Sequence, residues 1–467
     1  MKQTLTPWSA VPGTIRVIAV TLILAALTPL GAVAEGQSER ESPELVAVNM
    51  ADTHSAYDAY PRILTAVDRL SKQYAGQNLV FLFNGDLFEL GNAAALKSEG
   101  EADWEFLRRL REYGPVVINI GNHEFDFVPP EEFIETALRY DITVIGNIAD
   151  ASGRAPAPSA IDLAAGGATV RVVGVATNAM NTYPEPYRET LKIPDPVDWT
   201  ADSYAELVQG ADYSILLSHA GLLADRDMLA TLPANTLFAV GGHDHLVLQE
   251  EINGIPYMHN GFRGELVAVT EVYLSGTTPR LATHTIRVPD IDTADPAMTR
   301  TIEAVRTEYL DAEDTAVVAT VPRDMTVLEA AMWSVEAVRD AVGADVAFLN
   351  HSSFGSGLSE GPLPKYRFDQ FMRFDNDVMR AEVDASTLRS ILERSNQHTA
   401  TAFEERTGDF LYASEIDVED GETYEIVTSS WVALDFNQER YLGTEISFEQ
   451  VEGVTTKGIL TDALTTR

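Results

Sequence analysis

The sequence predicts an α/β fold with a large domain followed by a smaller mixed α/β domain. From Leu45 to about Arg287, short apolar runs alternate with amphipathic segments, which is the pattern of strands alternating with helices. A second set of such elements follows an acidic segment, residues 288–315, that contains two prolines. The length of 467 residues also exceeds what one hydrophobic core ordinarily serves, so two domains are expected.

The first 34 residues are predicted to be a signal peptide and not part of the fold. Lys2 and Arg16 precede an apolar run that ends in an A-x-A cleavage pattern at residues 32–34. The run is short for a membrane span, and Pro29 interrupts it. We therefore expect a periplasmic or secreted protein with no stable membrane insertion after cleavage. An uncleaved anchor is the alternative.

The first domain is predicted over residues 35–287 and contains most of the strand-like runs. Helices are expected between the early runs, at Pro61–Tyr74 and at Glu131–Tyr140, the latter after a Pro-Pro start. Near the end of the domain the runs follow one another without helices, which predicts an antiparallel part of the sheet system. The predicted strands are 45–50, 79–85, 116–121, 142–148, 169–177, 213–220, 237–242, 255–261 and 265–274.

Residues 288–315 are predicted to be a linker that contains one helical segment. The second domain is expected over residues 316–467. Its clearest elements are a strand ending at Val321, a helix over 326–341 and a strand over 345–350. Further mixed elements follow at 378–395, 410–416 and 424–434.

Composition excludes some classes of function. The net charge of -38 makes binding of a nucleic-acid polymer or an anionic membrane through a basic surface improbable. A solvated surface accounts for the acidity, and an acidic docking face is the alternative. The chain has no cysteine, so burial of the core and bound metals must stabilise the fold without disulfides.

Imidazole and carboxylate groups follow five of the predicted strands. Because ligand sites in open α/β sheets lie outside the carboxyl ends of the strands, we expect these groups to meet at one place. Polar turns are the simpler explanation of each one alone, but not of all five together. The residues are Asp52 and His54 after the first strand, Asp86 after the second, Asn122 and His123 after the third, His219 at the end of the sixth, and His243 and His245 after the seventh.

Such a cluster predicts divalent cations, because carboxylates and imidazoles gathered without a cation would repel or lack partners. Mixed oxygen and nitrogen donors suit two Zn, Mn or Fe ions. A pair of metals stabilises the attacking and leaving oxygens in phosphoryl transfer and ionises a bound water. His123 is then left to assist the leaving group, with Asp126 as the carboxylate that orients it. Glu124 and Asp244 are expected to be solvated or to lie behind the ligands.

The ordered motifs resemble those of the calcineurin-like metallophosphoesterases. These motifs are Asp-x-His at 52–54, Gly-Asp at 85–86, Gly-Asn-His-Glu at 121–124, His219, and Gly-His-x-His at 242–245. The spelling GNHEFD, followed by a second α/β unit, is similar to the secreted 5′-nucleotidase / 2′,3′-cyclic-nucleotide phosphodiesterase branch. The resemblance implies a four-layer α/β/β/α domain and a C-terminal substrate-binding domain.

The same resemblance implies roles for individual residues. One metal would be held by Asp52, His54 and His245, and the other by Asn122, His219 and His243. Asp86 would bridge the two metals, and His123 with Asp126 would form a catalytic pair. A metal-bound hydroxide would attack the phosphorus.

The C-terminal half departs from the family pattern. Members of the branch carry Asn-x-Gly-Gly-x-Arg where this chain has NHSSFGSGL from Asn350, without an arginine. Arg367 and Arg373 lie nearby in the sequence as possible replacements. The resemblance assigns substrate contacts to Asn350, Phe374, Asn376 and Trp431, where two rings would stack on a base. Phe374 and Trp431 as ordinary core aromatics are the alternative.

Four functions are considered from these observations. The favoured one is a secreted two-metal hydrolase of small phosphomonoesters or phosphodiesters, with nucleotides as the preferred substrates. The substituted loop at Asn350 leaves two enzymatic alternatives, a non-nucleotide phosphoesterase and a dimanganese thiosulfohydrolase of sulfur oxidation. A binding protein that keeps metals only for stability is the non-enzymatic alternative, and the complete set of ligands argues against it. The oligomeric state has no signal in the sequence.

Overall fold

The computed structural model describes residues 42–398 and 401–465. The predicted signal peptide, residues 1–34, lies outside the described residues. Within residues 42–398 and 401–465, no helix combines the length and the apolar composition that a membrane crossing requires.

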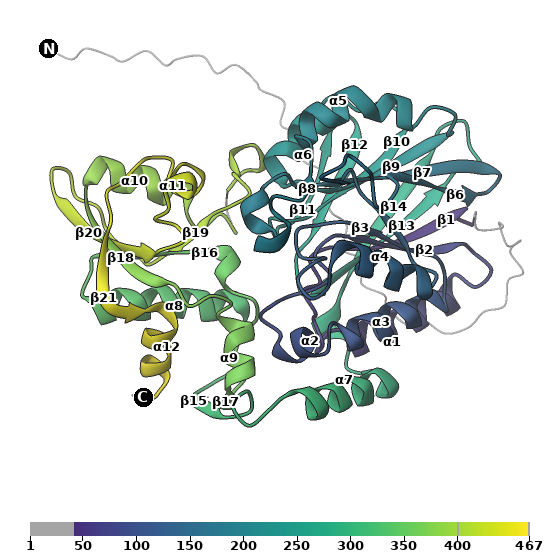
Figure 1. Ribbon diagram of the computed structural model, residues 1–467. Helices are drawn as coiled ribbons and strands as arrows, with labels where there is room; N and C mark the ends of the chain where they lie inside the picture. The colour runs from purple at the N-terminus through teal and green to yellow at the C-terminus, as the bar shows by residue number, and fades with distance from the viewer. Residues whose placement is uncertain (1–41, 399–400, 466–467) are drawn as a thin grey trace, which may run out of the picture. The chain divides into compact units, whose positions relative to one another are not determined.

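The first sheet has six strands in the order β14-β13-β1-β2-β3-β4 (Figure 1). Strands β1 to β4 are parallel, and β13 and β14 add an antiparallel edge, as the helix-free end of the domain predicts. The strands are β1 (Leu45–Met50), β2 (Leu79–Asn84), β3 (Val116–Asn119), β4 (Thr143–Ile145), β13 (Leu266–Tyr273) and β14 (Arg280–Arg287).

The second sheet also has six strands, in the order β11-β12-β10-β9-β7-β6. Its four central strands are parallel and its two edge strands antiparallel. The strands are β6 (Ala160–Ala165), β7 (Ala168–Ala176), β9 (Tyr213–His219), β10 (Thr236–Gly241), β11 (Val247–Ile252) and β12 (Ile255–Asn260). Strands β6, β11 and β14 were not predicted, because each has several exposed or polar positions and lacks a continuous apolar run.

Buried side chains alternate between two cores along the central strands. In β1, Val46 and Val48 face the core under the helices, whereas Leu45 and Ala47 belong to the core between the two sheets. Two-residue periodicity therefore makes both faces of the strand apolar.

Helices cover the outer faces of both sheets and complete four layers (Figure 1). In α1, the spacing of Ile63, Leu64, Val67 and Leu70 produces one buried stripe, and Pro61 stands in the first turn, where its missing N–H costs little. The predicted α/β/β/α arrangement is confirmed. The helices are α1 (Tyr60–Gln73), α3 (Glu101–Arg111) and α4 (Pro130–Arg139) on the first sheet, and α5 (Pro196–Leu207) and α6 (Leu222–Leu229) on the second.

The segment predicted as a linker contains α7 (Pro296–Tyr309), capped by Asp295. Its Met298, Ile302 and Val305 are buried in the core beneath the first sheet's helices. The segment therefore packs on the large domain and is not simply an exposed connection. The domain boundaries themselves stay a prediction.

The C-terminal half is built on a five-stranded sheet, β19-β16-β20-β18-β21. A capping box between Thr326 and Glu329 starts the long helix α8 (Val327–Val342), close to its predicted bounds. The remaining elements are α2 (Ala93–Lys97), β5 (Ala149–Asp150), β8 (Leu191–Lys192), β15 (Val317–Val321), β16 (Val346–Asn350), β17 (Gly361–Pro364), α9 (Lys365–Phe371), β18 (Asp377–Asp384), α10 (Ala385–Arg394), β19 (Leu411–Ala413), β20 (Thr423–Ser429), α11 (Asp435–Tyr441), β21 (Glu449–Thr455) and α12 (Thr456–Thr465).

A buried carboxyl group in α3 makes stability depend on pH. Asp103 accepts hydrogen bonds from the hydroxyls of Tyr57 and Tyr60, at 3.1 and 2.7 Å. Burial raises the pKa of Asp103 from 3.8 to about 7. Between these values the folded chain binds a proton that the unfolded chain has lost, so the free energy of unfolding falls as pH rises.

We expect Asp103→Asn to remove this dependence. The free energy of unfolding of the wild type, relative to the variant, should decline by a few kcal/mol, in order of magnitude, from about pH 4 to about pH 7. Denaturant unfolding at several pH values measures it. A difference between the two proteins that stays constant across this range would contradict the assignment.

Candidate metal centre

The candidate site lies where parallel strands of the two sheets end. Two buried asparagines hold the sheets in register there, at the ends of β2 and β3. Asn84 donates to the carbonyls of Ser218 and Val240, at 2.7 and 2.9 Å. Asn119 donates to the carbonyl of Val175 at 2.9 Å. The strand ends of both sheets are thereby fixed relative to one another, and so are the loops that follow them.

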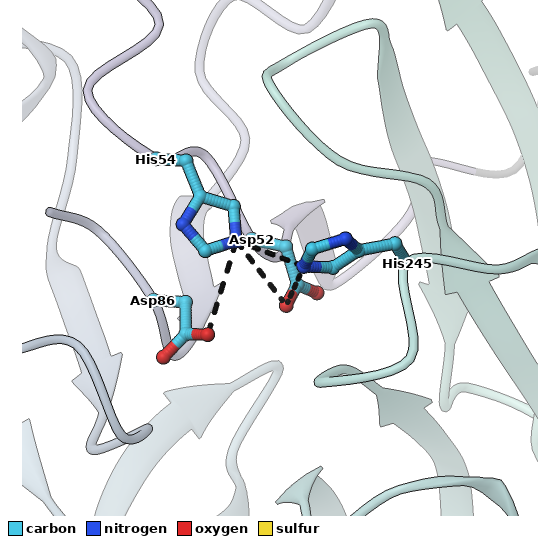
Figure 2. Close-up of side chains that lie close together, drawn as sticks. All are labelled: Asp52, His54, Asp86 and His245. Atoms are coloured by element: carbon cyan, nitrogen blue, oxygen red, sulfur yellow. Dashed lines mark hydrogen bonds and ion pairs between the residues drawn. The ribbon is translucent and has the colours of Figure 1, made fainter. Parts of the chain in front are cut away.

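The first group of converging side chains consists of Asp52, His54, Asp86 and His245 (Figure 2). The Nε2 atoms of His54 and His245 face each other at 2.9 Å. Nε2 of His54 lies 3.8 Å from a carboxylate oxygen of Asp86, and Nε2 of His245 lies 3.6 Å from one of Asp52. All four side chains are at least nine-tenths buried.

The second group shares Asp86 with the first and adds His219 and His243. Nε2 of His219 lies 3.1 Å from Oδ2 of Asp86. Asn122 joins this group through its Oδ1, which is 3.0 Å from Nδ1 of His243. All seven predicted metal ligands are thus brought together, with Asp86 between the two groups.

The loops that carry these ligands have an uncommon backbone conformation. Five of the seven predicted ligands have positive φ although none is glycine: Asp52, His54, Asp86, His243 and His245, with φ between 47 and 77°. Residues with side chains adopt this region rarely and at a cost in free energy. The fold therefore imposes a strained conformation at the places where ligands must turn inward.

Gly85 and Gly121 allow the close approach of the strand ends. A Cβ atom on Gly121 would lie 2.4 Å from Oδ1 of Asp86 and 2.8 Å from its backbone nitrogen. A Cβ atom on Gly85 would lie 2.4 Å from Nδ1 of His219. The glycines that precede Asp86 and Asn122 in the motifs are therefore required by packing around Asp86 and His219.

The donors fit divalent cations. Nδ1 of His219 lies 2.7 Å from the carbonyl of Asn84 and donates a hydrogen bond to it, which leaves Nε2 as the atom that faces Asp86. That Nε2 and Oδ2 of Asp52 are buried and have no hydrogen-bond partner among the described residues. Buried polar atoms in folded proteins nearly always have a hydrogen-bond partner, so these two atoms are available to bind a cation.

The donors differ in their charge states. Burial lowers the pKa of His54 and that of His245 well below the usual range, which keeps both imidazoles neutral. Burial alone would raise the pKa of Asp86, but His219 and the other imidazoles hold it well below its usual range. Burial alone would lower the pKa of His219, but Asp86 and Asp52 raise it to about 10, so this imidazole must release a proton to bind a metal.

His123 and Asp126 form a separate pair beside the ligands. Nδ1 of His123 lies 2.7 Å from Oδ2 of Asp126, and the imidazole keeps 16% of its exposure, more than Asp126 at 2%. Burial alone would lower the pKa of His123, but Asp126 and Asp86 raise it to about 10. The imidazole is therefore a proton donor at neutral pH that is held in one orientation and open to solvent.

Glu124 is fully buried. Of the two expectations for this residue, a solvated position is therefore wrong, and a position behind the metal ligands is confirmed. Its carboxylate accepts hydrogen bonds from the backbone N–H groups of Gly121, Leu87 and Asp86, at 2.6, 2.8 and 3.1 Å. It therefore joins the two ligand loops that follow β2 and β3. Asp244 is likewise buried and accepts from the N–H of Leu222 at 2.6 Å.

We expect Glu124→Ala to lower the free energy of unfolding by roughly 2–4 kcal/mol, because it leaves three buried N–H groups without an acceptor. Metal content should fall as well, since Asp86 loses its support. Denaturant unfolding and elemental analysis measure the two effects. Glu132→Ala, at an exposed position of α4, is the control and should change neither quantity. Equal stability of the two variants would contradict the role of Glu124.

A buried ionic cluster behind His54 was not predicted from the sequence. Glu89 lies 3.5 Å from Nδ1 of His54 and 2.5 Å from Nη2 of Arg373. Arg263 approaches the same carboxylate at 3.8 Å. Glu89 stands only three residues after Asp86, between two apolar residues, and that is the one signal by which it could have been found.

The predicted substrate residues lie in the C-terminal half in different environments. Asn350 is buried and bonds to the hydroxyls of Ser352 and Ser353, both at 2.8 Å. Phe374 is 45% exposed. Trp431 packs edge to face on Phe436, with ring centroids 5.9 Å apart. Asn376 is held through its backbone by Thr456.

His351 follows Asn350 in the loop that lacks the family's arginine. Its Nε2 donates to the carbonyl of Asp244 at 3.0 Å, and its ring stacks on Phe410 with centroids 4.4 Å apart. Of the two arginines named as replacements, Arg373 is bound to Glu89 and Arg367 to Asp58. The substituted loop is thus locked against the segment that carries His243 and His245.

Comparisons with known proteins agree with this geometry. The calcineurin-like phosphoesterase family matches residues 47–247. The uncharacterized metallophosphoesterase YunD of Bacillus subtilis (strain 168) is 22% identical over 332 residues, which cover 67% of this chain and 70% of YunD.

Several solved structures share the fold over both halves of the chain. A 5′-nucleotidase precursor from Thermus thermophilus superposes with a TM-score of 0.62 at 18% identity and covers 90% of this chain and 96% of its own. The 5′-nucleotidase from Candida albicans has a TM-score of 0.62 at 14% identity, covering 91% and 98%. The sulfate thiohydrolase SoxB from Thermus thermophilus has a TM-score of 0.63 at 13% identity, covering 91% and 94%.

At these identities the solved structures establish the fold and leave the substrate open. The family match covers the strands and loops that bring the carboxylates and imidazoles together. The predicted resemblance to the calcineurin-like metallophosphoesterases is therefore confirmed: residues 47–247 match the calcineurin-like phosphoesterase family and hold the candidate ligands, and the chain is a metal-dependent phosphoester hydrolase.

Proposed function

We propose that the protein hydrolyses the phosphoester bond of a small nucleotide. The observation that carries this proposal is the convergence of two ligand groups on Asp86, with the His123–Asp126 pair beside them. Likeness in fold to 5′-nucleotidases over nine-tenths of the chain supports the choice of nucleotide.

Two divalent cations, zinc or manganese, fit the two groups and would supply Lewis acidity to the phosphoryl oxygens and to the attacking water. Asp52, His54 and His245 would hold one of them, and Asn122, His219 and His243 the other, with Asp86 shared. Asp86 also accepts the backbone N–H of His123 at 3.0 Å, which ties the proton donor to the ligand set.

His123 would donate its proton from Nε2 to the leaving oxygen, because Nδ1 is engaged by Asp126. The carboxylate of Asp126 fixes the orientation of the ring. An alkoxide leaving group needs this proton most, since its conjugate acid is weak.

Phe374 and Trp431 are proposed to stack on the base of the nucleotide, with Asn376 and Asn350 shaping that side of the site. The exposure of Phe374 supports its role, because a ring packed in a core would be buried. Ring stacking tolerates different bases, so we expect modest selectivity among them.

A substrate panel on metal-reconstituted protein tests the proposal. Nucleoside monophosphates, a 2′,3′-cyclic nucleotide and p-nitrophenyl phosphate are assayed with added Mn²⁺ or Zn²⁺. We expect at least a tenfold preference in kcat/KM for a nucleotide over the aryl phosphate. Hydrolysis of the aryl phosphate alone would reject the nucleotide and retain a non-nucleotide phosphoesterase.

A second candidate is hydrolysis of a thiosulfate group by a dimanganese centre. The observation that favours it is the loop from Asn350, where His351 is locked on Asp244 and no arginine is present. The likeness in fold to sulfate thiohydrolase SoxB is as high as that to the nucleotidases. Release of sulfate from an S-sulfonated thiol, with no phosphate released from any phosphoester, would select this function.

We also propose that the protein acts in the periplasm or outside the cell, on the basis of the apolar run and cleavage pattern before Glu35. Expression of the full chain with a C-terminal tag tests this. A mature protein that begins at Glu35 in the periplasmic or medium fraction is the expected result. Intact chain in the cytoplasmic fraction would contradict it.

A further inference from the structure

A cavity lined by arginines lies next to the loop that carries Asp52 and His54. Its volume is about 180 Å³, well above the 10–15 Å³ or so that one water molecule requires. Arg62, Arg263 and Arg367 line it, together with the loop Gly355–Gly357 and Gln370. In a chain with 71 acidic and 33 basic residues, this is a local reversal of charge.

The buried arginines beside this cavity have too few carboxylates. Arg263 and Arg373 share one counterion, Glu89, at 3.8 and 2.5 Å. The carboxylate is therefore bonded to Arg373, and Arg263 is left at a distance that no hydrogen bond spans.

The same shortage recurs at the other wall. Asp58 pairs with both Arg306, at 2.8 Å, and Arg367. Apart from Asp58, Glu265 is the one residue lining the cavity that carries a carboxylate, and Glu265 is exposed. Among the residues that line the cavity, three arginines meet two carboxylates, so the lining carries a net positive charge.

Arg263 carries a buried positive charge at the lining of the cavity. Its side chain keeps only 10% of its exposure, and its Nε and Nη2 have no hydrogen-bond partner among the described residues. Burial lowers the pKa of the guanidinium to about 10, which leaves it charged at neutral pH. A buried guanidinium whose N–H groups lack acceptors is costly, and a bound anion that accepts from both groups would remove that cost.

We propose that this cavity binds a small oxyanion, a phosphoryl or sulfate group, through Arg263 and Arg62. The walls come from the loop after His54, the segment after β12, and the loop and helix of the C-terminal half, so the anion would contact both halves of the chain. The oxyanion is either a free inorganic ion or the second anionic group of a substrate whose phosphoester lies at the metal centre. The latter source rests on the proposed function.

Calorimetric titration with sulfate tests the site without any need for activity. We expect Arg62→Gln and Arg263→Gln to weaken sulfate binding to the metal-loaded protein at least tenfold. Arg300→Gln, at an exposed arginine of α7, is the control and should bind sulfate as the wild type does. Sulfate should also raise the Tm of the wild type more than that of Arg263→Gln. Arg62 lies on the exposed side of α1, so its variant is expected to fold even if Arg263→Gln does not.

Asp86→Ala distinguishes sulfate bound at the metal centre from sulfate bound in the cavity, because it removes the shared metal ligand. Binding in the cavity should survive this change, and binding at the metals should not. Sulfate binding that is lost in Asp86→Ala and unchanged in both arginine variants would overturn the cavity site.

Kinetics with two substrate classes distinguish the two sources. If the oxyanion belongs to the substrate, Arg62→Gln raises KM for a nucleoside diphosphate at unchanged kcat and leaves KM for p-nitrophenyl phosphate unaltered. If it is a free ion, the variant loses sulfate binding and neither KM changes. Sulfate binding equal to the wild type, with neither KM altered, would overturn the proposal. Absence of phosphoester hydrolysis in the wild type would reject the proposed function and leave the sulfate titration to decide on the cavity.

Discussion

His123→Ala should lower kcat about 10²- to 10⁴-fold on an alkyl phosphoester, because it removes the proton donor for the leaving oxygen. Metal content should stay at the wild-type level, since His123 belongs to neither group of converging ligands. Steady-state kinetics and elemental analysis on the same preparation measure both quantities.

The choice of substrate sharpens this test. p-Nitrophenolate leaves without protonation, so the loss on p-nitrophenyl phosphate should be much smaller than on an alkyl ester. An equal loss on both would assign His123 to stabilising charge on the phosphoryl group instead. His284→Ala, at an exposed histidine of β14, is the matched control. Wild-type turnover in His123→Ala would refute the catalytic pair.

Asp86→Ala should have an effect at least as large, on the order of a 10³-fold loss of kcat/KM or more, because both ligand groups contain this carboxylate. Its removal also takes the acceptor from the backbone N–H of His123. Elemental analysis should therefore find less metal, and the residual activity should not recover fully with added Mn²⁺.

Asp86→Asn keeps the shape of the side chain and one of its oxygens but removes the charge. A loss of metal in this variant is therefore not explained by misfolding. Asp103→Asn is the matched control, since it removes a buried carboxylate outside the ligand groups and should keep wild-type metal content. Full metal content in both Asp86 variants would reject Asp86 as the shared ligand.

The fold class and the candidate ligands could be predicted because each depends on local patterns. Alternation of apolar runs with amphipathic segments is enough to predict parallel strands with helices between them. The ends of such strands meet at one edge, so Asp52, Asp86 and His219 were expected to lie together although they are far apart in the sequence. The edge strands β6, β11 and β14 were missed because their exposed positions dilute the apolar signal.

Roles that depend on which groups lie behind a residue could not be predicted. Glu124 stands in the most informative motif of the chain, yet nothing in the spelling GNHEFD distinguishes a solvated carboxylate from one that accepts three backbone N–H groups. Asn84 and Asn119 are similar: each ends an apolar strand, and only the stacking of the two sheets shows that they join them.

The chemistry of the site could be predicted from the sequence, since the donors occur at the ends of predicted strands and their types are those of metal ligands. The surroundings of the site depend on the tertiary structure. Glu89, Arg263 and Arg373 come from three distant parts of the chain. The two arginines share the carboxylate of Glu89 only because the two halves of the chain are in contact. Charge balance at a buried site depends on neighbours in three dimensions, so no sequence pattern could reveal that Nε and Nη2 of Arg263 lack acceptors or that Arg263 lines a cavity.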